Sequence, residues 1–335
     1  MRRLAGVLIV WLALSLTVSA RQSEPPPGNT VPLTFGILPI GGPSESLESW
    51  KPMLDDLGRY LQRPVRSISV STYEGISEAI GEQRVDIAFL SGRLALGAVT
   101  HQSMQVVAQL TRGDGSKGYY AVLLVRNDSP LRTLNDLYAK PGHWRYARGE
   151  ALSVSGYLVP ETQLFAGRGL DSDTFFANVH IDNHQNNALA VANGEVDVGT
   201  NNTADLERFA QHFPEQAARL RELWRSTLVP HAVIVVRSDL PAPLRQRIAE
   251  FITTYGKGKD GARETANLKL IHDISGFAPV GNDALVPFAD IEYTLERRRA
   301  MTAQWVNEAA RKARLDKIDE DHRQLVNQLR AHAVP

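Results

Sequence analysis

Short apolar runs alternate with amphipathic stretches along most of the chain. The runs LTFGIL (33–38), VRSISVS (65–71) and VDIAFL (85–90) have the length and composition of β-strands. Between them, residues 47–62 and 73–83 carry apolar positions at helical spacing. This alternation predicts βαβ units and a parallel sheet.

A second set of strands and helices follows the first. The same patterns predict strands at 119–127, 144–149, 196–200 and 232–238, a helix from about Ser153 and another over 186–195. After residue 238 the pattern turns helical and stays so, and we expect helices over 244–258, 290–315 and 319–332.

Two consecutive α/β sets predict a protein of two α/β lobes joined by a hinge. We expect lobe 1 to comprise residues 32–124 and 233–335, including the C-terminal helices, and lobe 2 to comprise 125–232. In α/β folds ligands bind where strands end and helices begin, so the cleft between the lobes is the expected binding site.

The N-terminus has the pattern of a secretory signal. Two arginines precede an uncharged, almost wholly apolar run at 4–17, and a small-x-small sequence follows at 18–20. We predict a signal peptide over residues 1–20, removed after Ala20, and a flexible Pro- and Gly-containing leader over 21–31. An uncleaved membrane anchor is the alternative, although the apolar run is shorter than a spanning helix requires.

Composition narrows the class of protein. The chain has 335 residues, 43% of them hydrophobic, and 37 basic residues balance 37 acidic ones. This balance gives no bulk attraction to nucleic acid. The absence of cysteine excludes disulfides, thiolate chemistry, thiolate metal sites and a lipid-modified cysteine. With the signal, these features predict a protein of a Gram-negative periplasm.

The segment from Arg148 to Pro160 is the strongest candidate for ligand binding. A strand ends there and an apolar helical run begins, with Ser153 and Ser155 at the junction. Backbone N–H groups and the positive end of the helix dipole make such a junction a ready anion site. The alternative is an ordinary N-cap, since serine is common in that position.

Other polar residues stand at similar junctions. Asn202 lies between the strand at 196–200 and a following helix, and His184 precedes the helix at 186–195. Tyr73 and Tyr119 stand at the ends of other predicted elements and could donate to an anion. Taken singly, each has a plain structural explanation as a cap, a core aromatic or a loop histidine.

Enzyme motifs are missing from the sequence. It has no Gly-x-Ser-x-Gly, His-Glu-x-x-His, Walker or Gly-x-Gly-x-x-Gly motif, and its nine histidines lack metal-ligand spacing. We therefore expect neither catalysis nor a metal or other cofactor. A serine nucleophile, Ser153 or Ser155 with His184 as base, stays open as an alternative that only the fold can support.

Four segments together resemble a known family. They are Gly113–Tyr119, Ser153–Pro160, Asn187–Asn193 and Thr200–Thr203. In this order they resemble the phosphonate-binding periplasmic proteins of phosphonate and phosphite ABC importers, and the likeness runs from Phe35 to the C-terminal helices. The resemblance implies a type II periplasmic binding fold that closes on its ligand.

The resemblance also implies ligand-binding residues. In the family a Ser-Thr-Ser-Gly turn holds the phosphonate oxygens, and here that turn is Ser153, Val154, Ser155 and Gly156. The family's two phosphonate-contacting tyrosines match Tyr73 and Tyr119, and its cleft histidine matches His184. With Asn202 from the Thr-Asn-Asn-Thr segment, these complete the expected site.

Two departures from the family bear on the ligand. Relatives that bind 2-aminoethylphosphonate hold its ammonium with two carboxylates, at positions that here are Ala204 and Ala232. Asp205 is adjacent, but a helical neighbour points about 100° away, so we expect it to be a poor substitute. A buried ammonium without a carboxylate is costly. We therefore expect a compact anion such as phosphite, methylphosphonate or phosphate.

The resemblance implies partners as well. The ligand-bound protein would deliver its small oxyanion to a membrane permease driven by a separate ATPase. One alternative is delivery to a membrane sensor, and another is a periplasmic hydrolase of phosphorus esters. The long charged C-terminal helices could form a homodimer interface or simply cover lobe 1.

Overall fold

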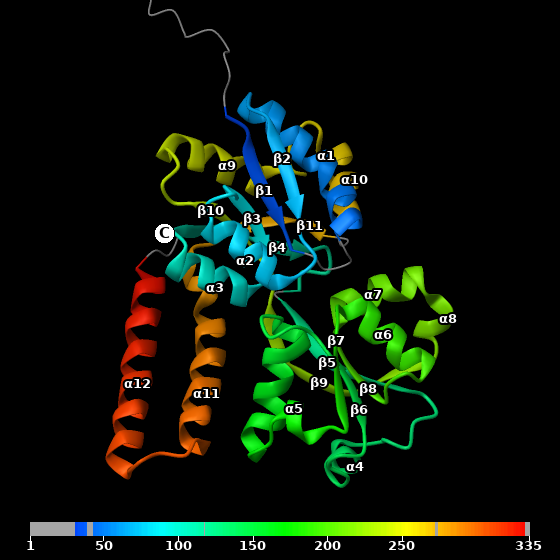
Figure 1. The fold of residues 1–335 in the computed structure, drawn as a ribbon. Helices are drawn as coiled ribbons and strands as arrows, with labels where there is room; N and C mark the ends of the chain where they lie inside the picture. The colour runs from blue at the N-terminus through cyan, green and yellow to red at the C-terminus, as the bar shows by residue number, and fades with distance from the viewer. Residues whose placement is uncertain (1–30, 39–42, 117, 272–273, 332–335) are drawn as a thin grey trace, which may run out of the picture. The chain divides into compact units, whose positions relative to one another are not determined.

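The backbone is described over four stretches of the chain. In this computed structural model they are residues 31–38, 43–116, 118–271 and 274–331 (Figure 1). The predicted signal peptide lies outside the described residues, as does the predicted leader apart from Val31. Residues from Pro32 onward form one unit by their contacts.

Six strands form the first sheet of the described residues, in the order β11-β4-β10-β3-β1-β2. They are β1 (Leu33–Ile37), β2 (Val65–Ser69), β3 (Ile87–Leu90), β4 (Met104–Arg112), β10 (Val233–Arg237) and β11 (Ile274–Pro279). Strand β1 pairs in parallel with both β2 and β3, which confirms the predicted βαβ units. Strand β10 runs antiparallel between β3 and β4.

Five strands form the second sheet, again counting the described residues, in the order β7-β6-β8-β5-β9. They are β5 (Gly118–Arg126), β6 (Arg145–Arg148), β7 (Asn178–Ile181), β8 (Val198–Asn202) and β9 (Leu220–Pro230). Strand β6 is parallel to β7 and β8, whereas β5 is antiparallel to β8 and β9.

The chain passes between the two sheets twice. It leaves the six-stranded sheet after Arg112 and returns to it at Val233, directly after β9. Strand β5 belongs wholly to the five-stranded sheet, so a boundary drawn between the sheets falls before Gly118 rather than at residue 124. The division into lobes at 32–124, 125–232 and 233–335 stays a prediction.

Helices connect the strands. The α-helices are α1 (Pro43–Leu61), α2 (Tyr73–Gly81), α3 (Gly92–His101), α4 (Leu134–Tyr138), α5 (Ser172–Phe175), α6 (His184–Asn193), α7 (Thr203–His212), α8 (Pro214–Ala217), α9 (Ala242–Thr254), α10 (Gly261–Leu270), α11 (Val286–Thr302) and α12 (Glu308–Arg330). The remaining turns are the π-helices η1 (Val154–Leu158) and η2 (Glu161–Phe165) and the 3₁₀-helices η3 (Ala166–Arg168) and η4 (Asn282–Leu285). No helix among the described residues is both long and apolar enough to cross a bilayer.

The sequence patterns do not predict four of the described strands, namely β4, β7, β9 and β11. The strands β7 and β9 lie at the two edges of their sheet and are half exposed, so they lack an apolar run. Strand β11 contains Gly276 and ends at Pro279, residues that usually mark turns. The prediction that the chain stays helical after residue 238 is therefore wrong, because β11 interrupts it.

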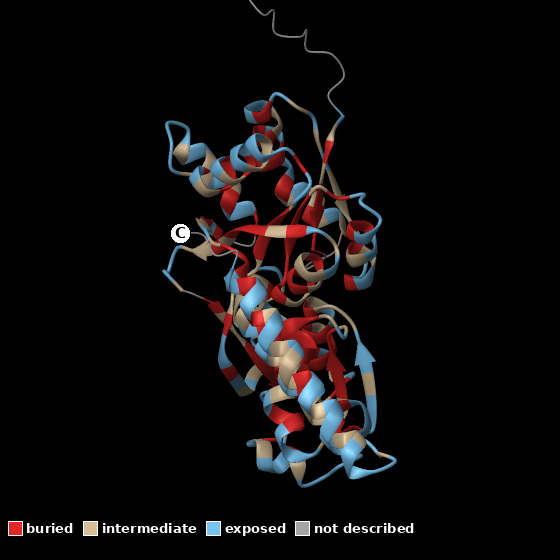
Figure 2. Cartoon of the chain, turned by 90° about the vertical axis from the view of Figure 1, so that its left-hand side faces the viewer, coloured by how far each residue is buried: buried red, intermediate tan, exposed pale blue. Residues whose placement is uncertain are grey.

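The segment 290–315 is predicted as one helix, but the structure divides it between two helices. Helix α11 ends at Thr302, and α12 begins at Glu308 after the cap Asn307. The Asn307 side chain accepts a hydrogen bond of 2.8 Å from the Ala310 N–H, which satisfies one of the first-turn donors. Helices α11 and α12 pack side by side, and α12, which faces the viewer in Figure 2, is largely exposed.

Aromatic side chains fill the core beneath the six-stranded sheet. Trp50 of α1 is fully buried, with its ring centroid 5.1 Å from that of Phe35 and 4.9 Å from that of Phe89. Buried residues gather on the strands in Figure 2. Below the five-stranded sheet, the stacked rings of Tyr146 and Phe176 anchor a second cluster. These two cores hold the strand ends, and the helices that follow them, in fixed positions.

Helix α3 packs on α11 through a glycine. A Cβ atom at Gly92 would fall on the ring of Phe288, a fully buried residue of α11. We expect Gly92→Ala to lower the free energy of unfolding by about 1–3 kcal/mol, because the core must shift to admit the methyl group. Urea denaturation measures this.

The control is Gly97→Ala on the same helix, where the nearest atom to the new Cβ is the Arg93 guanidinium nitrogen at 3.4 Å. This variant should be as stable as the unmodified protein or slightly more stable, because alanine favours a helix over glycine. A Gly92→Ala protein that unfolds at the same urea concentration as Gly97→Ala would contradict the prediction.

Candidate functional site

The turn between β6 and η1 is built around two glycines and a serine. Ser153 is the N-cap of η1, and its Oγ accepts a 3.1 Å hydrogen bond from the Gly156 N–H. A Cβ at Gly149 would lie 2.9 Å from the Gly156 Cα, and one at Gly156 would lie 2.6 Å from the Ser153 Oγ. Both positions therefore need glycine, and the turn closes tightly before the helix begins.

A hydrogen-bonded group of side chains lies beside this turn. The Ser155 Oγ is 3.1 Å from the His184 Nε2 and accepts a 3.2 Å hydrogen bond from the Asn202 Nδ2. All three side chains are buried. Burial lowers the pKa of His184 although the nearby Asp205 carboxylate opposes this, so the imidazole is neutral at neutral pH. The group thus offers polar contacts without a net positive charge.

Two tyrosines complete the set of donors. Burial raises the pKa of Tyr73 and of Tyr119. Tyr73 has Ser153 as a neighbour, and Tyr119 lies near Tyr73 and Ser155. The negative charge of Asp205 raises both values further. Both phenols therefore keep their protons throughout the physiological range and remain hydrogen-bond donors.

These side chains line one cavity of about 80 Å³. Its wall consists of Leu38, Tyr73, Phe89, Ser91, Leu110, Arg112, Tyr119, Ser153, Val154, Ser155, His184, Asn202, Ala204, Asp205, His231, Ala232 and Ile274. Seven of the eight residues expected from the sequence are among them. Gly156 is not, because its N–H is bound to Ser153 and it packs against the backbone of Gly149.

Asp205 lies in the cavity wall together with Ala204, and that it is a poor substitute for a carboxylate at 204 stays a prediction. Helix α7 starts at Thr203, and Asp205 is its third residue. The Asn202 side chain accepts from the Asp205 N–H at 2.9 Å and donates to its Oδ2 at 2.7 Å. Residues of a first helical turn surround the end of the axis, so a helix that ends at a cavity presents several of them to it.

Two basic residues of the wall, Arg112 and His231, stand outside the eight residues expected to form the site; for His231 the sequence suggests only an additional donor. Arg112 ends β4 and forms an ion pair with Glu207 of α7. The ring of His231 stacks 6.0 Å from that of Tyr119, and burial, aided by the charge of Arg112, lowers its pKa to about 4. Arg148, which lies close in sequence, points elsewhere and pairs with Asp173.

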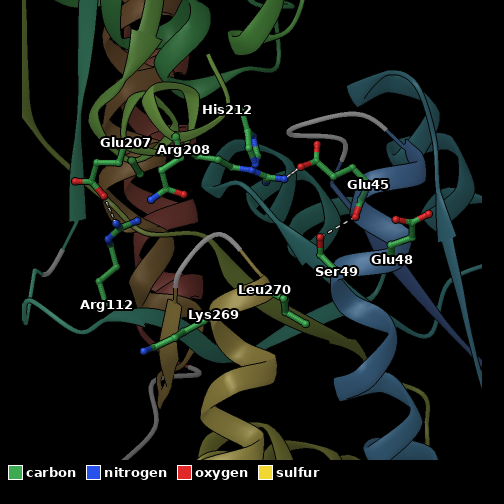
Figure 3. Close-up of a pocket in the computed structure, with 11 residues that line it drawn as sticks. Glu45, Glu48, Ser49, Arg112, Glu207, Arg208, His212, Lys269 and Leu270 are labelled. Carbon is green, nitrogen blue, oxygen red and sulfur yellow. Dashed lines mark hydrogen bonds and ion pairs between the residues drawn. The ribbon is translucent and has the colours of Figure 1, made fainter. Parts of the chain in front are cut away.

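A second cavity, of about 380 Å³, shares Arg112 and Ala204 with the first (Figure 3). Its wall contains charged residues from α1, α7 and α10, and within it Arg208 pairs with Glu45. Figure 3 shows Arg112 reaching the carboxylate of Glu207 and Arg208 reaching that of Glu45. Helix α7 of the five-stranded sheet is thereby tied to β4 and α1 of the six-stranded sheet.

The turn before η1 also contacts the six-stranded sheet. The Glu150 Oε2 accepts a 3.1 Å hydrogen bond from the Tyr73 N–H, in the first turn of α2. Burial and the neighbouring Glu74 carboxyl raise the pKa of Glu150 to about 7. One proton is therefore shared between two carboxyl groups that come from different sheets.

This carboxyl pair gives the folded protein a defined pH dependence. Because the folded pKa of Glu150 lies above its ordinary value of 4.5, the folded state binds more protons than the unfolded state between 4.5 and about 7. Stability from this group is full below that window and is lost as the pH rises through it.

Glu150→Gln imitates the protonated form, so we expect it to stabilise the protein at about pH 8 and to have little effect at about pH 4, below the window. Urea midpoints of both proteins at the two pH values measure the difference. Equal effects of the substitution at both pH values would contradict the assignment. Glu82→Gln on the surface, measured at the same two pH values, is the control.

Comparisons with known proteins agree with this architecture. A family model described as the periplasmic substrate-binding protein of a phosphonate ABC transporter matches residues 35–285. The chain is similar to the phosphonates-binding periplasmic protein of Escherichia coli K12, with 34% identity over 289 residues, which are 85% of this chain and 83% of that protein.

Solved structures show the same fold. The binding component of an ABC phosphonate transporter from Pseudomonas aeruginosa has a TM-score of 0.82 and 28% identity, over 90% of this chain and 98% of that one. The protein PhnD1 of Prochlorococcus marinus, solved with methylphosphonate, has a TM-score of 0.68 and 17% identity, over 79% of this chain and 98% of that one. The predicted type II periplasmic binding fold and the family resemblance are confirmed.

Proposed function

This chain belongs to the family of periplasmic phosphonate-binding proteins of ABC transporters, and we propose that it captures a compact oxyanion without an amino group. The observation that carries the proposal is the convergence of helix N-termini on one cavity. The first or capping residues of α2, α3, α6 and α7 line it, namely Tyr73, Ser91, His184 and Asn202. Each N-terminus carries a partial positive charge and unsatisfied N–H groups, which favour an anion.

The size of the cavity supports a small ligand. At about 80 Å³ it is far below the roughly 300–1,000 Å³ of sites for drug-sized molecules. The wall also contains apolar side chains from three strands of the six-stranded sheet and from the residue after β1, namely Phe89, Leu110, Ile274 and Leu38. A tetrahedral anion with a small apolar substituent suits a space whose wall has both polar and apolar groups.

The alanines at 204 and 232 argue against an ammonium group. Both line the cavity, in the places where the resemblance expects carboxylates. Asp205, the one carboxylate among the described residues of the wall, accepts a hydrogen bond from Asn202 and lies 3.9 Å from the His184 Nε2. Its position therefore suits accepting a hydrogen bond from a hydroxyl group of the anion. It suits less well the binding of an amino group at the other end of the ligand.

We expect export of the chain, closure on the ligand and delivery of the ligand to proceed as in other members of the family. Residues 1–20 would direct the chain to a Gram-negative periplasm and be removed. Contacts from elements of both sheets would favour the closed form once the anion is bound, because a ligand that binds one state better shifts the equilibrium to it. The closed form would dock on a permease driven by a separate ATPase, or on a membrane sensor.

A binding experiment tests the proposal. We expect phosphite, methylphosphonate and phosphate to raise the melting temperature and to bind in calorimetry, and 2-aminoethylphosphonate to bind more weakly. Ser155→Ala should weaken binding about tenfold or more, because a hydrogen bond to a charged group is lost. Ser238→Ala is the matched control, as this hydroxyl bonds only the Ser103 carbonyl at 2.7 Å, at the far end of β10. Tight binding of 2-aminoethylphosphonate alone would refute the proposal.

The role of Asp205 makes a pH-dependent prediction. A carboxylate beside the anion repels a fully deprotonated ligand, so we expect the affinity for phosphite to fall between about pH 6 and about pH 8. Asp205→Asn should flatten this dependence and strengthen binding at the higher pH, whereas Asp128→Asn on the surface should not. Calorimetry at both pH values measures it, and an unchanged dependence in Asp205→Asn would exclude this role.

Hydrolysis of phosphorus esters is a second candidate, favoured by the 3.1 Å distance between the Ser155 Oγ and the His184 Nε2. A nucleophile and its base need such a contact. The small cavity leaves little room for a leaving group, and no carboxylate orients the histidine ring from its Nδ1 side among the described contacts. Incubation with chromogenic phosphate and phosphonate esters tests this, and turnover that Ser155→Ala abolishes would support it.

A further inference from the structure

Ser91 is a buried polar residue that none of the contacts described above uses. It follows β3 and is the N-cap of α3, and it lines the ligand cavity. Its Oγ is buried and has no hydrogen-bond partner among the described residues. A buried hydroxyl without a partner costs about 1–3 kcal/mol, so its presence calls for an explanation.

Capping does not provide that explanation. A serine in this position normally accepts a hydrogen bond from an N–H of the first helical turn. In α3 the Ser91 side chain makes no such bond, and only its backbone carbonyl takes part, accepting from the Ala95 N–H at 2.9 Å. The first-turn N–H groups of this ten-residue helix are therefore not capped by the hydroxyl.

Packing fixes this arrangement. The next residue, Gly92, is pressed against the Phe288 ring, and the preceding strand residues Phe89 and Leu90 are fully buried. The backbone around Ser91 is thus held from both sides, and the start of α3 is fixed at the cavity. The donors Ser153 and Ser155, from the turn that follows β6, line the same cavity.

We propose that the Ser91 hydroxyl, at the N-terminus of α3, donates a hydrogen bond to an oxygen of the bound oxyanion from the side of the six-stranded sheet. This proposal rests on the proposed function and adds a ligand-binding residue to it. The other donors are, apart from Tyr73, mostly carried by the five-stranded sheet. A donor on β3 and α3 lets the anion link both sheets directly, and so couples binding to closure of the cleft.

The chemistry of the site supports a donor rather than an acceptor there. A tetrahedral oxyanion offers several lone pairs on each oxygen, and Asp205 already supplies an acceptor for a ligand hydroxyl. The surrounding side chains Leu38, Phe89 and Leu110 offer no competing polar group. With the anion bound, the Ser91 Oγ would gain the partner that it lacks in the described contacts.

The test compares Ser91→Ala with Ser46→Ala. Ser46 in α1 is also buried with an unpartnered Oγ, but it does not line the cavity. Calorimetry with phosphite and with phosphate gives the dissociation constants, and urea denaturation without ligand gives the stability. We expect Ser91→Ala to weaken binding of at least one of the two anions about 10- to 100-fold. Ser46→Ala should leave both constants unchanged.

The stability measurement separates binding from folding. Since the hydroxyl is unsatisfied without ligand, Ser91→Ala should leave the ligand-free protein as stable as before or make it more stable. Unchanged binding of both anions by Ser91→Ala would overturn the proposal while leaving the proposed function intact. A failure of the unmodified protein to bind any compact phosphorus oxyanion would remove both. Weakened binding that accompanies an equal loss of stability would assign Ser91 a structural role instead.

Discussion

The structure depends on bringing the N-termini of several helices to one small, buried space. Helices α2, α3, α6 and α7 each place a first or capping residue in the wall of the cavity, and the turn before η1 adds Ser153 and Ser155. Partial positive charges of like sign repel one another when water is excluded. A bound anion relieves this repulsion, which explains how neutral donors can form an anion site.

Charge in the cavity is balanced rather than purely positive. Arg112 stands in the wall but is paired with Glu207, and His231 has a pKa of about 4 and is neutral. Asp205 places a negative charge among the donors. A site of this kind distinguishes anions by their protons and by the position of each oxygen, because its net charge attracts none of them strongly.

The same elements connect the two sheets. Glu150 accepts from the Tyr73 N–H, and α7 forms ion pairs with Arg112 and with Glu45. These contacts surround the cavity, so the wall and the connection between the sheets are made by the same helix ends. A change in the ligand or in the protonation of Glu150 would therefore affect both at once.

Much of the site could be predicted because its residues stand at recognisable junctions. Ser153, Ser155 and Asn202 each follow a strand that the sequence predicts and stand where a helix begins, and His184 precedes the helix predicted at 186–195. Ser91 stands at the same kind of junction, directly after the apolar run VDIAFL. A single serine in that position is also typical of an ordinary N-cap, so the sequence does not distinguish the two roles.

The sequence by itself determined seven of the described strands, the parallel β1–β3 unit and the family, because hydrophobic periodicity and motifs are local. Only the tertiary structure decided that Asp205 and Arg112 line the cavity and that Gly156 does not. Those outcomes depend on where a helix axis ends relative to another sheet, and on which buried groups already have partners. Distances between residues far apart in the chain, such as Arg112 and Glu207, are set by packing and carry no local signal.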